Sequence, residues 1–218
     1  DNWNVVSEKL KTLYIELNKG KGQKNKLKFS NLLAPMPRAY QWADGSAYVN
    51  HVSLVRQARG VEMPDSFWTD PLMYQGGSDD FTPPNSPILV SNLEWGVDFE
   101  AEIAVITDYI PMGSNLKVIE DKILLVMLAN DVSLRNLIPD ELSKGFGFFQ
   151  SKPSTSFSPV AVTIDELGES WQKCKLHEIV KVNLNDNPFG RTNAGKDMTF
   201  NFSELIFHAS KTRNLRAG

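Results

Sequence analysis

The sequence predicts an α+β protein in which β-strands predominate. Two stretches, residues 97–105 and 179–185, alternate apolar and polar side chains with the period of a strand. Between residues 34 and 87, closely spaced Pro and Gly residues indicate loops and short strands rather than long helices. Helical spacing of apolar residues is limited to segments near the two ends and to short stretches between strands.

A helix is expected at the N-terminus, where apolar residues recur with helical spacing between residues 1 and 19. The lysine-rich stretch at 19–26 indicates a solvated linker, because no aromatic side chains are interleaved with its charges as in a nucleic-acid site. Residues 26–33 predict a short strand that enters the main domain. We therefore expect residues 1–30 to form an appendage and linker, and residues 31–218 to form the main domain.

The rest of the chain alternates short helices and strands separated by turn signals. In order, the sequence predicts a strand at 97–105, helical residues from 116 leading into a buried strand at 123–129, a helix at 136–142, a flexible aromatic loop at 145–149, a strand at 157–164, a hairpin strand at 179–185 that turns at 186–188, and a helix at 202–215.

The composition is that of a soluble globular protein. The 218 residues carry a net charge of −3, and 41% of them are hydrophobic, so there is no basic excess to suggest nucleic acid as a partner. The longest apolar run, at 123–129, is too short to cross a bilayer, so no membrane partner is expected. The single cysteine, Cys174, excludes an internal disulfide and fits a reducing, cytoplasmic location. No cysteine-enzyme signature surrounds it.

Three acidic residues fall at alternate positions of the predicted strand 97–105. Asp98, Glu100 and Glu102 would project from one face of that strand, while Phe99, Ala101, Ile103 and Val105 would form a buried face. Like charges at this spacing are costly unless a cation or bulk water neutralises them. A hard divalent metal is the natural cation, and a solvated strand face is the plainer alternative.

Two further clusters of ionisable residues lie where strands end or loops begin. One runs from Asp44 to His51, and the other runs from Asn130 to Asn136, with Lys152 close behind. Each has a structural explanation: a core histidine, a helix cap at Asp131 and a surface lysine. Together they would supply an oxygen-rich cage, one imidazole and two cations.

From about Asn31 to Gly218 the chain resembles the fumarylacetoacetate hydrolase family. Several motifs in the family's order carry this resemblance: Asp44 with His51 seven residues on, Met73-Tyr74-Gln75-Gly76, Asp98-Phe99-Glu100-Ala101-Glu102, Asn130-Asp131-Val132-Ser133-Leu134-Arg135, and Lys152 ahead of Thr155, Ser158 and Pro159.

The resemblance implies a mixed β-sandwich roll and a homodimer. It also implies a metal-dependent hydrolase that cleaves the C–C bond of a fumarylacetoacetate-like or acylpyruvate-like β-diketo acid in aromatic or tyrosine catabolism. The implied roles are Glu100, Glu102, Asp131 and Asp44 as ligands of Mg²⁺ or Ca²⁺, His51 as general base, Arg135 and Lys152 facing the oxyanion or the substrate carboxylate, and Tyr74 and Tyr48 binding the polar tail of the acid.

Other activities of this family stay open from sequence. They are hydration of 2-oxo acids, decarboxylation of oxaloacetate-like acids, and a catalytically silent metal-binding role. The Asp44 and His51 pair favours hydrolysis, because a hydrolase needs a base that activates water. In the longer members a glutamate that steadies this base follows a segment like residues 213–218. Because that segment ends the present sequence, we expect the domain to be C-terminally incomplete.

Overall fold

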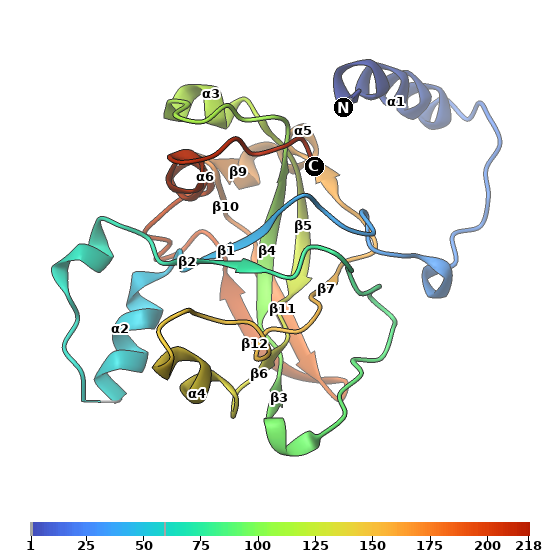
Figure 1. The fold of residues 1–218 in the computed structure, drawn as a ribbon. Helices are drawn as coiled ribbons and strands as arrows, with labels where there is room; N and C mark the ends of the chain where they lie inside the picture. Colours follow the sequence, from blue (N-terminus) through green and yellow to red (C-terminus); the bar gives the residue numbers. More distant parts are fainter. Residues whose placement is uncertain (1, 59) are drawn as a thin grey trace.

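The computed structural model describes residues 2–58 and 60–218, and it contains both helices and strands (Figure 1). The helices are α1 (Trp3–Asn18), α2 (Val49–Ala58), α3 (Leu116–Glu120), α4 (Ile138–Ser143), α5 (Ile164–Leu167) and α6 (Phe202–Ser210). The strands are β1 (Trp42–Gly45), β2 (Met73–Gly76), β3 (Val97–Asp98), β4 (Ala101–Thr107), β5 (Ile123–Asn130), β6 (Ser133–Leu134), β7 (Ser156–Phe157), β8 (Val162–Thr163), β9 (Trp171–Gln172), β10 (Lys175–Leu176), β11 (Ile179–Leu184) and β12 (Asn187–Asn193).

The central sheet is built on the long antiparallel pair β4 and β5. Strands β7 and β8 pair with the other edge of β5, and the remaining strands form two-stranded ladders: β1 with β2, β3 with β6, β9 with β10, and β11 with β12. The register sets Ala101 opposite Asn130. The acidic residues just before β4 and just after β5 therefore emerge beside each other.

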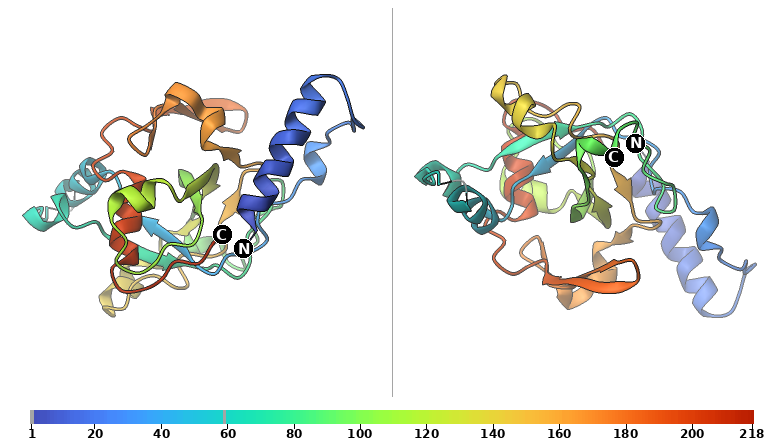
Figure 2. Two further views of the ribbon diagram at one scale, coloured as in Figure 1. Left: turned by 90° about the horizontal axis from the view of Figure 1, so that it is seen from above. Right: turned by 90° about the horizontal axis from the view of Figure 1, so that it is seen from below.

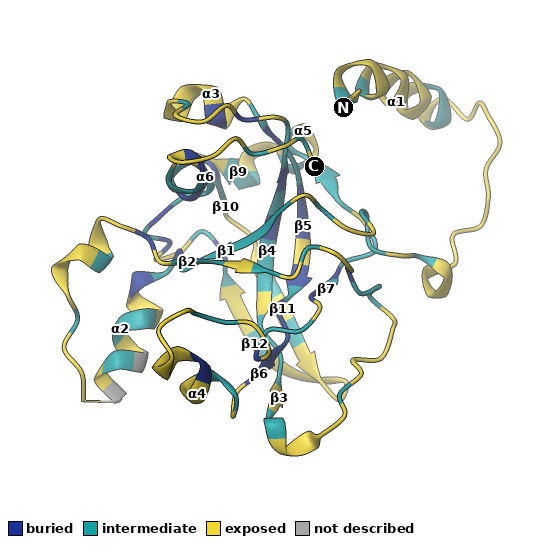
Figure 3. Cartoon of the chain, in the orientation of Figure 1, coloured by how far each residue is buried: buried dark blue, intermediate teal, exposed yellow. Residues whose placement is uncertain are grey.

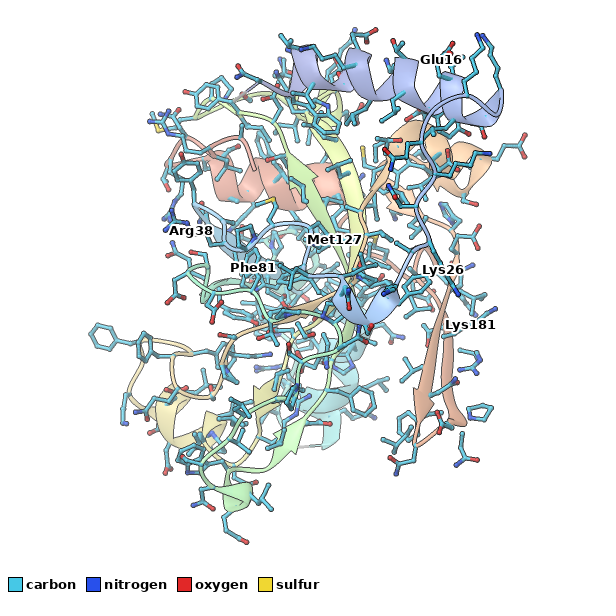
Figure 4. The ribbon with its side chains drawn as sticks, turned by 90° about the vertical axis from the view of Figure 1, so that its right-hand side faces the viewer. Glu16, Lys26, Arg38, Phe81, Met127 and Lys181 are labelled. Carbon is cyan, nitrogen blue, oxygen red and sulfur yellow. The ribbon has the colours of Figure 1, made fainter. Side chains whose placement is uncertain are left out.

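The main core lies on one face of this pair. Ala104 and Ile106 of β4 and Met127 of β5 are buried there with Phe81 and Phe157. Figure 4 labels Met127 and Phe81 in this core. Because side chains alternate along a strand, Ala104 and Ile106 share their face with Glu102. The expectation that Phe99, Ala101, Ile103 and Val105 form the buried face was wrong, since all four are exposed or only half-buried.

The single acidic strand predicted at 97–105 is also wrong, because the ladder breaks at Phe99 and Glu100. Strand β3 pairs with β6, whereas β4 pairs with β5 in the central sheet. At the break, the backbone N–H of Glu100 donates to the side-chain oxygen of Asn130 at 3.1 Å. Asp98 and Glu102 consequently belong to different ladders.

Two further predictions failed in the N-terminal half. Residues 26–33 contain a short 3₁₀ turn, Phe29–Asn31, in place of a strand, and most of their side chains are exposed. The turn-rich region contains the ten-residue helix α2. Its start is fixed by packing rather than by periodicity, because Val49 is buried in a second apolar cluster with Leu205 of α6.

Several other elements were predicted with the right type and shifted ends. The hairpin of β11 and β12 is confirmed, as are α1, the helix and strand at α3 and β5, and α6, which ends at Ser210. The strand predicted at 157–164 is divided into β7 and β8, because a turn follows Ser158, whose hydroxyl donates to the Val160 carbonyl at 2.7 Å. The predicted helix at 136–142 begins later, as α4.

Helix α1 lies at the periphery, joined to β1 by a segment that contains only the short 3₁₀ turn Phe29–Asn31 (Figures 1 and 2). None of its residues is buried, and most of its surface is exposed (Figure 3). Residues 1–30 as an N-terminal appendage, and the β-sandwich roll, stay predictions. Among the described residues, no helix is both long and apolar enough to cross a membrane.

Gly76 lies close to a large side chain, so a substitution there tests how tightly this part of the core is packed. An added Cβ at Gly76 would lie 2.1 Å from Cδ1 of Trp42, whose ring packs edge-on against Phe157. We expect Gly76→Ala to lower the free energy of unfolding by about 1–3 kcal/mol, the usual cost of overpacking. Denaturant titration measures the change.

Gly77 provides the matched control. A Cβ there would meet Asp79 Oδ1 at an ordinary 3.6 Å. Gly77→Ala should therefore unfold close to the parent midpoint. Equal destabilisation by both variants would show that the close approach of Gly76 to Trp42 is not what limits this position.

Candidate metal centre

Four carboxylates converge at the end of the central sheet. Asp44 comes from β1, Glu100 from the break before β4, Glu102 from β4, and Asp131 from the residue after β5. One oxygen of each lies within 4.8 Å of the others. The backbone N–H of Asp131 donates to the Glu100 carbonyl at 3.0 Å, which fixes these two residues side by side.

A buried lysine lies against this cluster. The ammonium of Lys152 donates to Glu100 Oε2 at 2.8 Å, to Asp131 Oδ2 at 2.9 Å and to the Ser133 hydroxyl at 2.8 Å. Its side chain is only 7% exposed. Burial alone would lower the pKa of Lys152, but the charge of Asp131 and the hydrogen bonds to Glu100 and Asp131 outweigh burial and raise it. Lys152 is therefore held as a cation.

Asp131 is the most enclosed of the four acids, with a relative exposure of 1%. It accepts hydrogen bonds from the Tyr74 hydroxyl and, at 3.2 Å, from the Thr155 hydroxyl. The ring of Tyr74 lies edge-on to Phe148, and the Lys152 ammonium lies 5.3 Å and 5.9 Å from the two ring centres. These aromatic faces complete the surroundings of the cation.

Arg135 braces the outer side of the cluster. Its Nε donates to Asp98 Oδ2 at 2.8 Å, and its Nη2 lies 2.7 Å from Glu100 Oε1. Glu100 is thereby held between two cations, Arg135 and Lys152. Asp98 belongs to this brace and not to the group of converging carboxylates. The hydrogen bond from Arg135 lowers the pKa of Asp98.

The remaining two acids show the cost of confining like charges. Burial, and then the charge of Asp131, raises the pKa of Asp44 to about 7. Burial, and then the charges of Asp44, Asp131 and Glu100, raises the pKa of Glu102 to about 9. Carboxylate oxygens are the preferred ligands of hard divalent cations, and a bound cation would relieve this repulsion. The donor set thus fits a divalent metal.

A cavity of about 910 Å³ is lined by three of the four acids, Asp44, Glu100 and Glu102, and also by Lys152 and Arg135. His51, exposed on the first turn of α2, lines the same cavity, and its role as a base stays a prediction. Tyr48 and Tyr74 line it too. Their hydroxyl protons are directed to protein groups, Tyr48 to the Ala194 carbonyl at 2.5 Å and Tyr74 to Asp131.

Two residues near the site were not singled out from sequence. Phe148 lies in the glycine-rich aromatic loop, and no local pattern distinguishes it from the other phenylalanines there. Glu141 lies on α4 and contacts the segment just before Lys152. Its only sequence signal is an acidic residue in a short helix, which is normally solvated.

The geometry and the motifs agree with a profile comparison. The profile of the fumarylacetoacetate (FAA) hydrolase C-terminal domain matches residues 41–218. The chain belongs to this family. This finding confirms the resemblance seen in the motifs. No curated protein matches the chain at a significant level.

Solved structures of the family share the fold. A fumarylacetoacetate hydrolase family protein from Yersinia pestis CO92 is similar at 18% identity and a TM-score of 0.65, over 84% of this chain and 80% of that one. A 5-carboxymethyl-2-hydroxymuconate delta-isomerase from Mycobacterium smegmatis is similar at 21% identity and a TM-score of 0.64, over 86% and 67%. A 2-hydroxyhepta-2,4-diene-1,7-dioate isomerase from Mycobacterium marinum is similar at 19% and 0.59, over 85% and 63%.

These structural similarities establish the fold, and at such low sequence identities they leave the reaction open. The chain spans about two thirds of each isomerase.

The raised pKa values predict how stability depends on pH in metal-free protein. For Asp44 and Glu102 the folded-state pKa lies above the unfolded value, so the folded state binds more protons in between. Their contribution to stability is therefore fully present at low pH and is lost as pH rises from about 4 toward about 9. We expect the melting temperature in EDTA to fall over this range, as followed by scanning calorimetry.

Added Mg²⁺ or Ca²⁺ should raise the melting temperature, and more strongly at pH 8 than at pH 5, because the cation displaces protons from these carboxyls. Glu102→Gln should flatten the pH dependence of the metal-free protein. A metal-free melting temperature that rises steadily with pH, unaffected by this substitution, would contradict the assigned repulsion.

Proposed function

We propose that this protein is a divalent-metal-dependent hydrolase that cleaves the C–C bond of a β-diketo acid of the fumarylacetoacetate or acylpyruvate type. The observation that carries the proposal is the placement of His51 on the same cavity as the carboxylate cluster and its buried lysine. A base, an oxygen-rich cage and a permanent cation are the groups that such a cleavage requires.

The cage matches Mg²⁺ or Ca²⁺ by its donor chemistry, with Glu100, Glu102, Asp131 and Asp44 as the residues that would hold the ion. When bound, the ion supplies Lewis acidity toward the two oxygens of an enolised 1,3-dicarbonyl. Both partners of Glu100, Arg135 and Lys152, hold its carboxylate in place next to this position.

The chain's own residues supply the proton chemistry. His51 would accept a proton from the attacking water, since an imidazole is the side chain best suited to that transfer near neutral pH. Lys152, which its carboxylate partners hold protonated, would stabilise the oxygen that becomes negative as the C–C bond breaks. Arg135 and the tyrosines Tyr48 and Tyr74 would face the polar groups of the acid.

Isomerisation of an unsaturated 2-oxo acid is the second candidate. It is favoured by two of the similar structures, whose names describe isomerases of dioic or muconic acids. Enolisation would be common to both reactions, but isomerisation and decarboxylation do not need an activated water. The role of His51 therefore separates hydrolysis from these alternatives.

His51→Ala should lower turnover of an acylpyruvate by about two to four orders of magnitude, the usual scale for a general base. Mg²⁺ affinity should change little, because the imidazole is not among the converging ligands. Loss of the enol absorbance in the presence of Mg²⁺ measures turnover, and calorimetry measures binding of the ion.

His177→Ala is the matched control, because His177 is an exposed histidine that is not among the residues lining the cavity. Glu102→Ala should abolish both turnover and metal binding while the fold persists. Turnover at the parent rate in His51→Ala would remove the general-base role from His51 and favour a reaction without water activation.

A further inference from the structure

Glu141 is a buried carboxylate whose two oxygens accept hydrogen bonds from a single loop. It is 9% exposed on α4. Oε2 accepts from the backbone N–H groups of Phe149 at 3.1 Å and Ser151 at 3.0 Å, and Oε1 accepts from that of Gln150 at 2.6 Å. The Ser151 hydroxyl also donates to Oε2, at 2.5 Å. These hydrogen bonds outweigh burial and lower the pKa of Glu141 to about 2.

The loop that Glu141 holds has little apolar packing of its own. Gly145 and Gly147 adopt left-handed backbone conformations, with φ of 80° and 99°. Phe146 is fully exposed and Phe149 is 86% exposed. Successive backbone N–H groups aimed at one ionised carboxylate form strong, charge-assisted hydrogen bonds. The conformation of residues 149–151 therefore depends on the charge and shape of Glu141.

Lys152 is the residue that follows this loop. Ser151 is fully buried, and its carbonyl accepts the N–H of Leu134 on β6 at 2.8 Å. The backbone before Lys152 is thus tied on one side to the sheet and on the other to Glu141. A shift of this backbone would move the ammonium, whose three partners lie at 2.8–2.9 Å.

We propose that Glu141 is a positioning residue that fixes residues 149–151, and so sets the Lys152 ammonium against Glu100, Asp131 and Ser133. The inference deepens the proposed function and rests on it only for the part that Lys152 plays in the reaction. The position of Lys152 itself can be tested without any substrate, because the ammonium contacts two of the residues that would hold the metal.

A double-mutant cycle tests this link. Mg²⁺ affinity is measured by titration calorimetry for the parent, Glu141→Gln, Lys152→Met and the double variant. Gln keeps the size of the side chain but removes the charge and replaces one acceptor oxygen by a donor. Asp140→Asn, which changes the exposed neighbour on the same helix, is the matched control.

We expect Glu141→Gln to change the Mg²⁺ dissociation constant by about ten-fold, the lower end for residues that orient a metal site, and in the same direction as Lys152→Met. In the Lys152→Met background the same substitution should have less than about a two-fold effect, because the group that it positions is gone. Asp140→Asn should match the parent. An unchanged affinity in Glu141→Gln, or a full shift that persists without Lys152, would overturn the proposal.

If the parent protein does not bind Mg²⁺, the proposed function is refuted but the positioning role of Glu141 is not. A second measurement then tests that role. Acylation of Lys152 by acetic anhydride, followed by peptide mass spectrometry, should be faster in Glu141→Gln than in the parent and in Asp140→Asn. Equal rates in all three proteins would refute the positioning role. Should Glu141→Gln fail to fold, Ser151→Ala, which removes one donor to Glu141, takes its place in both measurements with the same expected pattern.

Discussion

Confinement of four carboxylates around one small volume is the constraint on which the rest of the site depends. Their mutual repulsion in a buried setting disfavours ionisation of Asp44 and Glu102. The Lys152 ammonium offsets part of that charge through Glu100 and Asp131. One buried cation does not balance four acids, and a bound divalent cation would relieve more of their repulsion. The affinity that we expect for such an ion and the instability that we expect of the metal-free site therefore have the same origin.

The fold creates this arrangement by combining a long antiparallel pair of strands with a loop that is held in place by other elements. The antiparallel register of β4 and β5 brings Glu102 and Asp131 to one end of the sheet. The break at Phe99 and Glu100 lets the side chain of Glu100 turn toward Asp131. Lys152 arrives from a loop, so its place depends on contacts that the sheet does not provide.

Patterns that depend on neighbours along the chain could be predicted from the sequence. The hairpin of β11 and β12 follows from alternation and a turn, and the spacing of acids and the family motifs indicated which carboxylates would meet. Features set by distant residues could not be predicted. Helix α2 starts where Val49 packs against α6, Asp98 is taken out of the cluster by Arg135, and Glu141 acts only through a loop eight to ten residues away. The local sequence does not encode such contacts.

A crystal grown with Mn²⁺, a substitute for Mg²⁺ with measurable anomalous scattering, would test the central claim most directly. We predict one anomalous peak among Asp44, Glu100, Glu102 and Asp131, at about 2.0–2.6 Å from the oxygens that bind it, with Lys152 still next to the cluster. A fully occupied peak elsewhere, with the Glu102 side chain turned away from Glu100 and Asp131, would contradict it.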